Sequence, residues 1–301
     1  MRFYLFLSLA FALLANVLPA RAVEYEPAAC LGFAWTFVKP AVAVMPANPT
    51  SADAFTVCYH GGEYSEYASI QLDGNQLMVT VIDSGFSWSP NPLIGLGQSV
   101  GPLAPGDYQL TVILTGEPPT VSLGYPLTVA SKVPIRVAAA TTGSAGWVVE
   151  YYNRVLDHYF MTSLADEMSA LDDGRLKGWQ RTGYAFKVSE SPTASPVCRF
   201  YIPPNLGDSH FYSASPAECA ATANKFPGLQ LETGSLFHAE LPDVATGKCA
   251  TGLQPVYRSW NQRRDSNHRY TTDAYVRKTM SSLGYLPEGY GADGVVMCAP
   301  K

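Results

Sequence analysis

The chain has few charged residues and no excess of basic ones. Charged side chains make up 15% of the 301 residues, and 20 Lys and Arg stand against 25 Asp and Glu, a formal net charge of -5. Proteins that bind the phosphate backbone of nucleic acids carry basic patches. The composition therefore argues against nucleic acid as a partner.

Beyond the first 22 residues the sequence has no apolar run long enough to cross a bilayer, which takes about 20 residues. The longest apolar run, residues 3–14, follows Arg2 and precedes the small-residue site Ala20-Arg21-Ala22. This layout is typical of a cleavable secretory signal. We expect residues 1–22 to be removed and the mature chain to begin at Val23. The predicted protein is secreted or periplasmic, with no membrane insertion after cleavage.

The sequence also lacks the local motifs of common enzymes: a Gly-x-Ser-x-Gly elbow, a His-Glu-x-x-His helix, a Walker loop and a dinucleotide fingerprint. Gly207-Asp208-Ser209-His210 resembles the nucleophile block of Gly-Asp-Ser esterases, but those enzymes place it early in an α/β domain. A turn-forming serine accounts for it. Asp166 and Glu218 are the obvious acids for glycoside hydrolysis, yet both stand at helix-capping positions. We predict no catalytic residue, no cofactor and no metal.

No Cys-x-x-Cys spacing is present, which leaves six cysteines, an even number, in a chain predicted to be exported. Oxidising compartments favour disulfides over free thiols. Cys30 and Cys58 are expected to pair because they are the only cysteines of the first half. The other four allow three pairings, of which proximity favours Cys198 with Cys219 and Cys249 with Cys298.

The first half has the pattern of a β-sandwich. Short β-rich runs, residues 55–59, 70–72, 77–82, 108–114 and 127–129, are separated by Asn, Pro, Gly and Asp clusters. Residues 103–112 resemble the tyrosine corner of immunoglobulin-like folds, in which Tyr108 would bond the backbone across the turn. An ordinary Pro-Gly hairpin is the alternative. We predict a mainly β chain: an immunoglobulin-like antiparallel sandwich over residues 23–137, a linker over 138–146 and a second module over 147–301.

A short phrase occurs three times in that module: Asp157-His158-Tyr159-Phe160, Ser209-His210-Phe211-Tyr212 and Asn267-His268-Arg269-Tyr270. Five residues after each histidine stands a good helix N-cap: Ser163, Ser215 and Asp273. We predict a pseudo-threefold repeat of short strands, each unit with a short helix. The three histidines are expected to be equivalent and packed. A zinc site made of three imidazoles is the alternative.

Residues 148–300 resemble a repeat module found in secreted bacterial proteins and catalogued as a domain of unknown function. The segments that carry the resemblance include residues 151–153, 157–160, 197–201, 215–219, 255–258, 267–273, 288–289 and 296–300. The sequence departs from the pattern where residues 229–231 replace a Trp and where Ile202-Pro203, in place of Asn, follows the predicted strand at Phe200-Tyr201. The resemblance implies an extracellular module, sometimes appended to secreted hydrolases, with no established ligand or reaction.

Recognition is the function that these patterns favour. Aromatic rings stack on the apolar faces of sugars, and amides pair with hydroxyls. The candidate ligand-binding residues are Tyr152, Asn153, Trp179, Trp260, Asn261 and Tyr285, with core packing as the alternative for each. We expect a non-catalytic protein that binds a cell-surface or environmental glycan. A surface protein as partner, an inhibitory module, and an extracellular hydrolase or metal-dependent enzyme remain alternatives, and the oligomeric state stays open.

Overall fold

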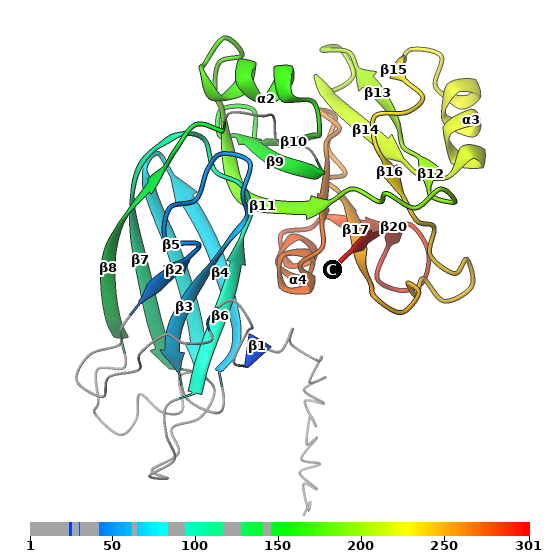
Figure 1. Ribbon diagram of the computed structural model, residues 1–301. Coiled ribbons are helices and arrows are strands. Elements are labelled where there is room, and N and C mark those ends of the chain that lie inside the picture. Colours follow the sequence, from blue (N-terminus) through cyan, green and yellow to red (C-terminus); the bar gives the residue numbers. More distant parts are fainter. Residues whose placement is uncertain are drawn as a thin grey trace, which may run out of the picture.

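The computed structural model describes residues 24–25, 30, 42–61, 65–83, 94–116, 128–140 and 146–301. The predicted secretory signal, residues 1–22, lies outside this range. The described chain is mainly β, as predicted, with three short helices in its second half (Figure 1). The predicted linker falls between the last strand of the first half, which ends at Val137, and the first strand of the second, which begins at Trp147.

The first half forms two four-stranded sheets. Their strands are β1 (Glu24–Tyr25), β2 (Ala43–Met45), β3 (Phe55–Gly61), β4 (Ser65–Asp73), β5 (Gln76–Asp83), β6 (Ile94–Val100), β7 (Gly106–Gly116) and β8 (Thr128–Val137). One sheet has the order β1-β6-β3-β2 and the other β4-β5-β7-β8. All neighbours run antiparallel except β5 and β7, a parallel pair that the sequence pattern did not indicate.

Alternating apolar residues build the core of this sandwich. Leu77, Val79 and Val81 are fully buried in β5, whereas the intervening Met78 and Thr80 are partly exposed. A strand sends successive side chains to opposite faces, so this alternation defines one buried face. The predicted bond across the turn is confirmed, because the hydroxyl of Tyr108 donates to a main-chain carbonyl four residues earlier at 2.9 Å.

The second half contains three units of lead strand, second strand, helix and return strand. The first unit has β9 (Trp147–Asn153), β10 (His158–Thr162), α2 (Ala165–Asp172) and β11 (Trp179–Lys187); the second has β13 (Cys198–Ile202), β14 (Ser209–Ser213), α3 (Pro216–Lys225) and β15 (Gln230–Thr233); the third has β17 (Leu253–Trp260), β18 (His268–Thr271), α4 (Ala274–Ser282), β19 (Leu286–Glu288) and β20 (Val295–Pro300). Two short strands, β12 (Ser195–Pro196) and β16 (His238–Ala239), pair with each other.

One central core joins the three units. Val148, Val197 and Val256 lie at the corresponding point of each lead segment, and all three are buried in the same cluster. Tyr212 and Tyr270 belong to that cluster as well. The units therefore bury their apolar faces against one another, as short repeats must.

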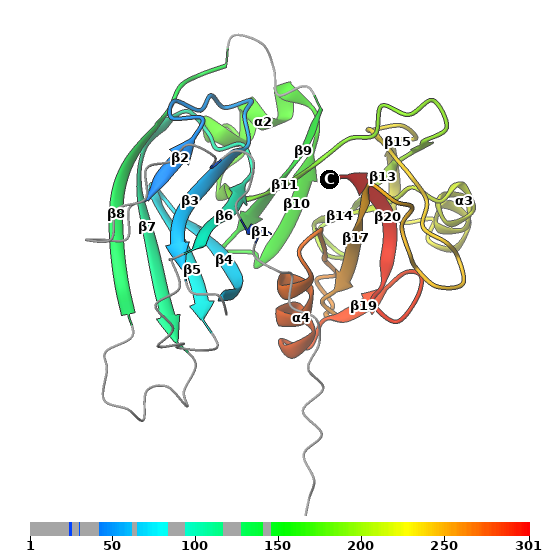
Figure 2. The same ribbon diagram turned by 60° about the horizontal axis from the view of Figure 1, so that its bottom comes forward.

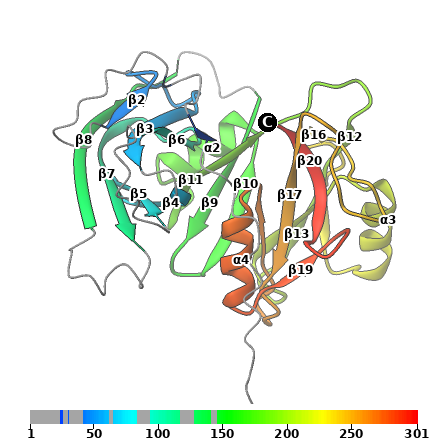
Figure 3. The ribbon, with the colours of Figure 1, turned by 90° about the horizontal axis from the view of Figure 1, so that it is seen from below.

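The return strand β11 of the first unit packs against the sandwich, where it contacts β4 and β6 (Figure 2). The amide of Gly101 donates to the carbonyl of Gly183 at 2.7 Å, and the amide of Ile70 donates to the Tyr184 hydroxyl. A Cβ on Gly101 would lie 2.6 Å from that of Ala185, so only glycine allows this approach. Helix α4 of the third unit also contacts β4, and Figure 3 shows α4 on the side of the module that faces the sandwich.

All six cysteines are paired. The disulfides join Cys30 to Cys58, Cys198 to Cys219 and Cys249 to Cys298, which confirms the predicted pairing. Within the described part of the chain, no helix has the length and apolar character needed to cross a membrane.

Candidate functional site

The three units share one hairpin register. In each unit a charged residue of the lead strand lies opposite a large buried side chain: Glu150 opposite Met161, Arg199 opposite Tyr212, and Arg258 opposite Tyr270. The helix N-cap follows three residues after that buried side chain, at Leu164, Ser215 and Asp273. The three units therefore superpose when Met161, Tyr212 and Tyr270 are aligned. Relative to an alignment on the three histidines, this moves the first unit by one residue.

The predicted equivalence of the three histidines is wrong. In the shared register the counterpart of His210 and His268 is Tyr159, and His158 lies on the opposite face of its strand. The reason is one extra residue between the first histidine and its helix, because a shift of one residue turns every strand side chain to the other face. Among the described residues, no group of three or more His, Cys, Asp or Glu side chains is arranged to hold a metal ion.

The prediction of an N-cap is confirmed at Ser215, whose side chain accepts from the amide of Glu218, and at Asp273. It is wrong at Ser163, because the extra residue moves the first position of α2 and puts Leu164 at the cap. The hydroxyl of Ser163 instead donates to the carbonyl of Leu236 in the next unit.

Three buried polar side chains, His158, Ser209 and Asn267, occupy the position at which the units meet. Nδ1 of His158 lies 3.3 Å from the carbonyl oxygen of the residue before Ser209, and Ser209 donates to the carbonyl of the residue before Asn267. Asn267 bonds both main-chain groups of Tyr159 at 2.9 Å. The three side chains thus connect the units in a closed cycle, and Ser209 is a buried structural serine.

Ion pairs between a buried arginine and a partly exposed glutamate reinforce two of the three junctions in the same way. Arg199 of the second unit donates two bonds, at 2.6 and 2.8 Å, to Glu167 of the first unit. Arg258 of the third unit donates in the same way to Glu218 of the second. Paired bonds of this kind combine charge attraction with fixed geometry.

The third junction reverses the charges. The lead-strand position holds Glu150 in place of arginine, and Val276 stands where Glu167 and Glu218 stand in their helices. Arg269 of the third unit then supplies the cation and donates two bonds of 2.9 Å to Glu150. Both side chains are buried.

A histidine and a second glutamate complete the pair at Arg258. Nε2 of His268 and Nε of Arg258 both lie 3.2 Å from Glu288. Burial lowers the pKa of the His268 imidazole below its ordinary value, against the opposing effect of Glu288. Burial raises the pKa of Glu288, but the bond from His268 and the charges of His268 and Arg258 outweigh it and leave the pKa lowered. His210, Arg199 and Glu232 repeat this geometry.

This arrangement does not resemble the acid pair of a glycoside hydrolase. Such an enzyme needs one carboxylic acid whose raised pKa keeps it protonated. Glu218 and Glu288 both have lowered pKa values: burial raises each, but Arg258 and Ser213 outweigh it at Glu218, and His268 and Arg258 outweigh it at Glu288. Ionised carboxylates held by guanidinium groups stabilise the junctions.

The three hairpin turns lie at one end of the module, and each is fixed by a ring of its own unit. A ring from each lead strand bonds a residue of its own turn: Tyr152 to Asp157, Tyr201 to Asp208, and Trp260 to Ser266. Asp157 and Asp208 have positive φ angles of 55° and 51°. Aspartate tolerates this left-handed conformation better than most residues, which explains its place in these turns.

Side chains of the first and third units meet at these turns in what we name the turn surface: Tyr152, Asp157, Tyr159, Arg263, Asp265 and Tyr285. The rings of Tyr152 and Tyr159 lie 4.8 Å apart, tilted by 35°. Arg263 donates to the Asp157 carboxylate at 2.6 Å and to Asp265 at 3.0 Å. Asp157, Asp265 and Arg263 are 49%, 51% and 38% exposed.

Tyr285 belongs to the same surface through its electrostatics. Burial raises its pKa to about 12, and the charges of Asp157 and Tyr159 act in the same direction. Tyr152 likewise has a raised pKa, from burial first and from its bond to Asp157. Both hydroxyls are protonated at neutral pH, and that of Tyr152 donates a hydrogen bond to Asp157.

The six candidate ligand-binding residues fall into different environments. Tyr152 and Tyr285, which come from different units, are near enough to interact electrostatically, and both belong to the turn surface. Asn153 and Asn261 are buried, 5% and 6% exposed, and their side-chain oxygens accept main-chain amides within their own turns. Trp260 bonds its turn, and Trp179 packs 5.8 Å from Phe160.

Sequence reasoning missed Asp157, Tyr159, Arg263 and Asp265 as site residues. Asp157 and Tyr159 stand in the repeated phrase, and repetition favours a structural interpretation of its residues. Arg263 and Asp265 stand in a turn longer than that of the first unit, which is the one local sign that the third turn reaches its neighbour.

None of the curated proteins matches the chain, and none of the solved structures does. A family model does match part of the chain, and its description gives no ligand or reaction. Residues 147–295, nearly the whole three-unit module, match the family described as a domain of unknown function, DUF5648.

Proposed function

We propose that the protein is a secreted, non-catalytic recognition protein whose turn surface binds a cell-surface or environmental glycan. The observation that carries the proposal is the set of half-buried rings, Tyr152 and Tyr285, beside the exposed Asp157-Arg263-Asp265 chain. Tyrosine rings offer an apolar face to the C–H side of a sugar, while carboxylate and guanidinium groups pair with its hydroxyls.

Hydrogen bonds between its own side chains preorganise the turn surface. The hydroxyl of Tyr152 is fixed by Asp157 at 2.8 Å, and the Asp157 carboxylate is in turn fixed by Arg263. Side chains already ordered by such bonds lose little further freedom when they bind, which favours affinity. Asp157 and Asp265 share one arginine, so the surface keeps acceptor capacity for sugar hydroxyls.

Export is supported by the cysteines. All six form disulfides, which persist in oxidising compartments and are rare in the cytosol. An exported protein meets extracellular polysaccharides and the glycans of cell surfaces, which is the context that the proposal requires.

The test is a glycan array probed with the mature chain, residues 23–301, with its disulfides intact. Tyr152→Ala should lower retention on the bound glycans by about tenfold, the loss expected from one stacked ring and its bonds. Tyr201→Ala is the matched control, because Tyr201 makes the same 2.8 Å bond to its turn aspartate in the second unit, away from Tyr285.

Two results would overturn the proposal. One is binding no higher than background for every glycan on the array. The other is an equal loss for Tyr201→Ala and Tyr152→Ala, since that would assign the effect to the turns and not to the turn surface. Thermal melting of both variants checks that each remains folded.

A further inference from the structure

A depression of about 510 Å³ lies at the other end of the module from the turns. Its wall includes Leu253, the first residue of β17, whereas the turn follows Trp260, the last. An eight-residue strand spans about 23 Å between its end residues. The depression is therefore separate from the turn surface.

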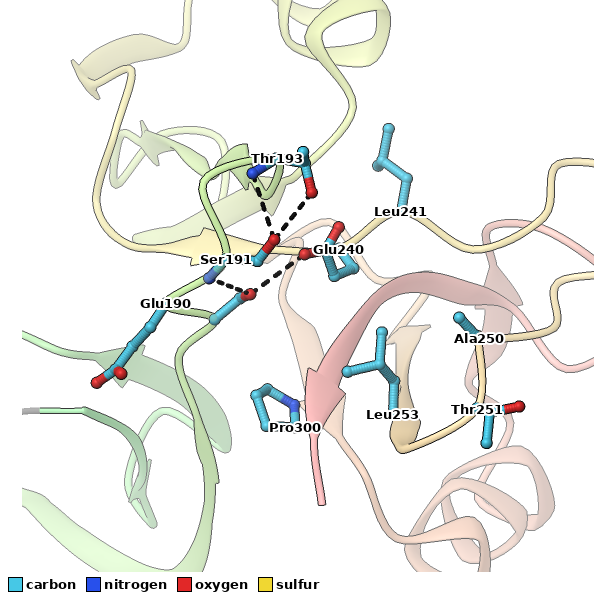
Figure 4. Close-up of a pocket in the computed structure, with 10 residues that line it drawn as sticks. Glu190, Ser191, Thr193, Glu240, Leu241, Ala250, Thr251, Leu253 and Pro300 are labelled. Carbon is cyan, nitrogen blue, oxygen red and sulfur yellow. Dashed lines mark hydrogen bonds between the residues drawn. The ribbon is translucent and has the colours of Figure 1, made fainter.

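The lining combines hydroxyl groups, carboxylates and an aliphatic wall. Ser191, Thr193 and Thr251 supply hydroxyls, and Leu253 and Pro300 supply apolar surface (Figure 4). Glu190 and Glu240 are the charged residues of the lining, which contains no Lys, Arg or His. A hydroxylated ligand with a C–H face and a positive group fits this chemistry, and an anionic ligand does not.

The carboxylate of Glu240 is held in place. Ser189, which is 9% exposed, donates to its Oε1 at 3.3 Å. The main-chain amide and carbonyl of Glu240 both bond Cys298, at 3.0 and 2.8 Å. In Figure 4 the side chain of Glu190 extends away from Glu240, so Glu240 is the carboxylate that faces the interior.

The opposite wall is fixed by the same cysteine. Cys298 forms a disulfide with Cys249, and the next two residues, Ala250 and Thr251, line the depression. One bridge thus holds both walls. A rigid, preformed site loses little freedom when a ligand binds.

We propose that this depression binds a protonated amino sugar, with the ammonium group on Glu240, the ring hydroxyls on Ser191 and Thr193, and the C–H face on Leu253 and Pro300. A lysine side chain shares the ammonium group but lacks the ring hydroxyls. The broad lining of hydroxyl-bearing residues therefore favours the sugar.

The experiment is titration calorimetry of the mature chain at about pH 6 with the glucosamine tetrasaccharide, its fully N-acetylated form and tetragalacturonate. Only the first should bind, because only it carries ammonium groups. Glu240→Gln keeps the shape and the acceptor for Ser189 and should weaken binding about tenfold or more. Glu190→Gln removes the same charge from the rim and should change affinity less than twofold.

Amide shifts of Ser191 and Thr251 on titration with the glucosamine tetrasaccharide would place the ligand in the depression. If Glu240→Gln does not fold, Thr251→Arg puts a positive charge at an exposed position of the wall and should abolish binding. Three results would overturn the assignment: equal binding of the N-acetylated form, unchanged affinity in both Glu240→Gln and Thr251→Arg, or no binding of the glucosamine tetrasaccharide at all.

Tyr152→Ala keeps this proposal distinct from that for the turn surface. It should leave glucosamine tetrasaccharide binding intact, whatever it does on the glycan array. Loss of that binding in Tyr152→Ala would move the ligand to the turn surface and overturn the assignment to the depression.

Discussion

Replacing Arg269 by methionine removes one half of the ion pair that joins the third unit to the first. Glu150 and Arg269 are 5% and 9% exposed, and the guanidinium donates two bonds of 2.9 Å to the carboxylate. In Arg269→Met the Glu150 carboxylate stays buried without its cation. The opposite variant, Glu150→Met, strands the guanidinium.

Breaking a buried pair on one side costs about 3–5 kcal/mol, because the remaining charge loses its partner. A folding unit of about 150 residues loses roughly 2–4 °C in Tm for each kcal/mol. We therefore expect each single variant to melt about 6–20 °C lower. The double variant Glu150→Met/Arg269→Met leaves no charge stranded, so it should recover most of the loss.

Urea unfolding followed by tryptophan fluorescence measures this double-mutant cycle. The coupling energy between Glu150 and Arg269 should be at least about 2 kcal/mol. Arg175→Met is the control: Arg175 bonds Asp173 at 2.7 Å, but the two side chains are 64% and 46% exposed. It should change stability by less than about 0.5 kcal/mol. Single variants as mild as this control, or losses that simply add in the double variant, would refute the reasoning.

Three other predictions concern pH, one turn and the sandwich. Because the pKa of His268 is lowered from 6.5 in the folded protein, protonation of His268 favours the unfolded chain. The Tm should therefore be constant above pH 6.5 and decrease below it, and it should decrease further below pH 4.5, where Glu288 is protonated. A constant Tm by calorimetry from pH 7 to pH 5 would contradict this. Gly207→Ala should cost about 2 kcal/mol or more in urea, since its Cβ would lie 2.6 Å from a main-chain oxygen, while Gly174→Ala, which meets nothing within 4 Å, should cost clearly less. Tyr108→Phe should lower the free energy of unfolding by about 1 kcal/mol in the same assay. An unchanged value would show that the 2.9 Å bond of Tyr108 does not stabilise the sandwich.

The sequence predicted the fold class and all three disulfides because these follow from local patterns. Alternation in residues 77–82 marks a strand wherever the chain goes, and Cys198 and Cys219 are close enough to pair by proximity. The parallel pairing of β5 with β7 could not be predicted. It depends on which strands meet after the chain has folded, and no local pattern carries that information.

The register of the first unit shows why the repeat was aligned incorrectly. His158 and His210 each follow a turn-forming residue and precede two aromatic residues, but the residue that matches His158 in space is Ser209. His158, Ser209 and Asn267 differ in type and share only the capacity to bond a neighbouring main chain. Because the residue type differs at this position in each unit, an alignment based on residue identity does not detect it.

The departures from symmetry gather at one junction. Glu150, Arg269 and Val276 each break the pattern of the other units, and all three lie where the third unit meets the first. An arginine at position 150 would face Val276 and stay buried without a counter-ion. The first and third units are thus matched to each other by charge, which disfavours the addition of a fourth unit.

The turn surface lies across that same junction, with Tyr152 and Asp157 from the first unit and Arg263 and Tyr285 from the third. The bond from Arg263 to Asp157 joins two units, whereas in the second turn Asp208 bonds Tyr201 of its own unit. A module of three similar units therefore offers this combination of rings and charges once. Recognition through it should accordingly show one ligand per chain, and a stoichiometry of three would mean that the similar units, and not their unequal junction, make the site.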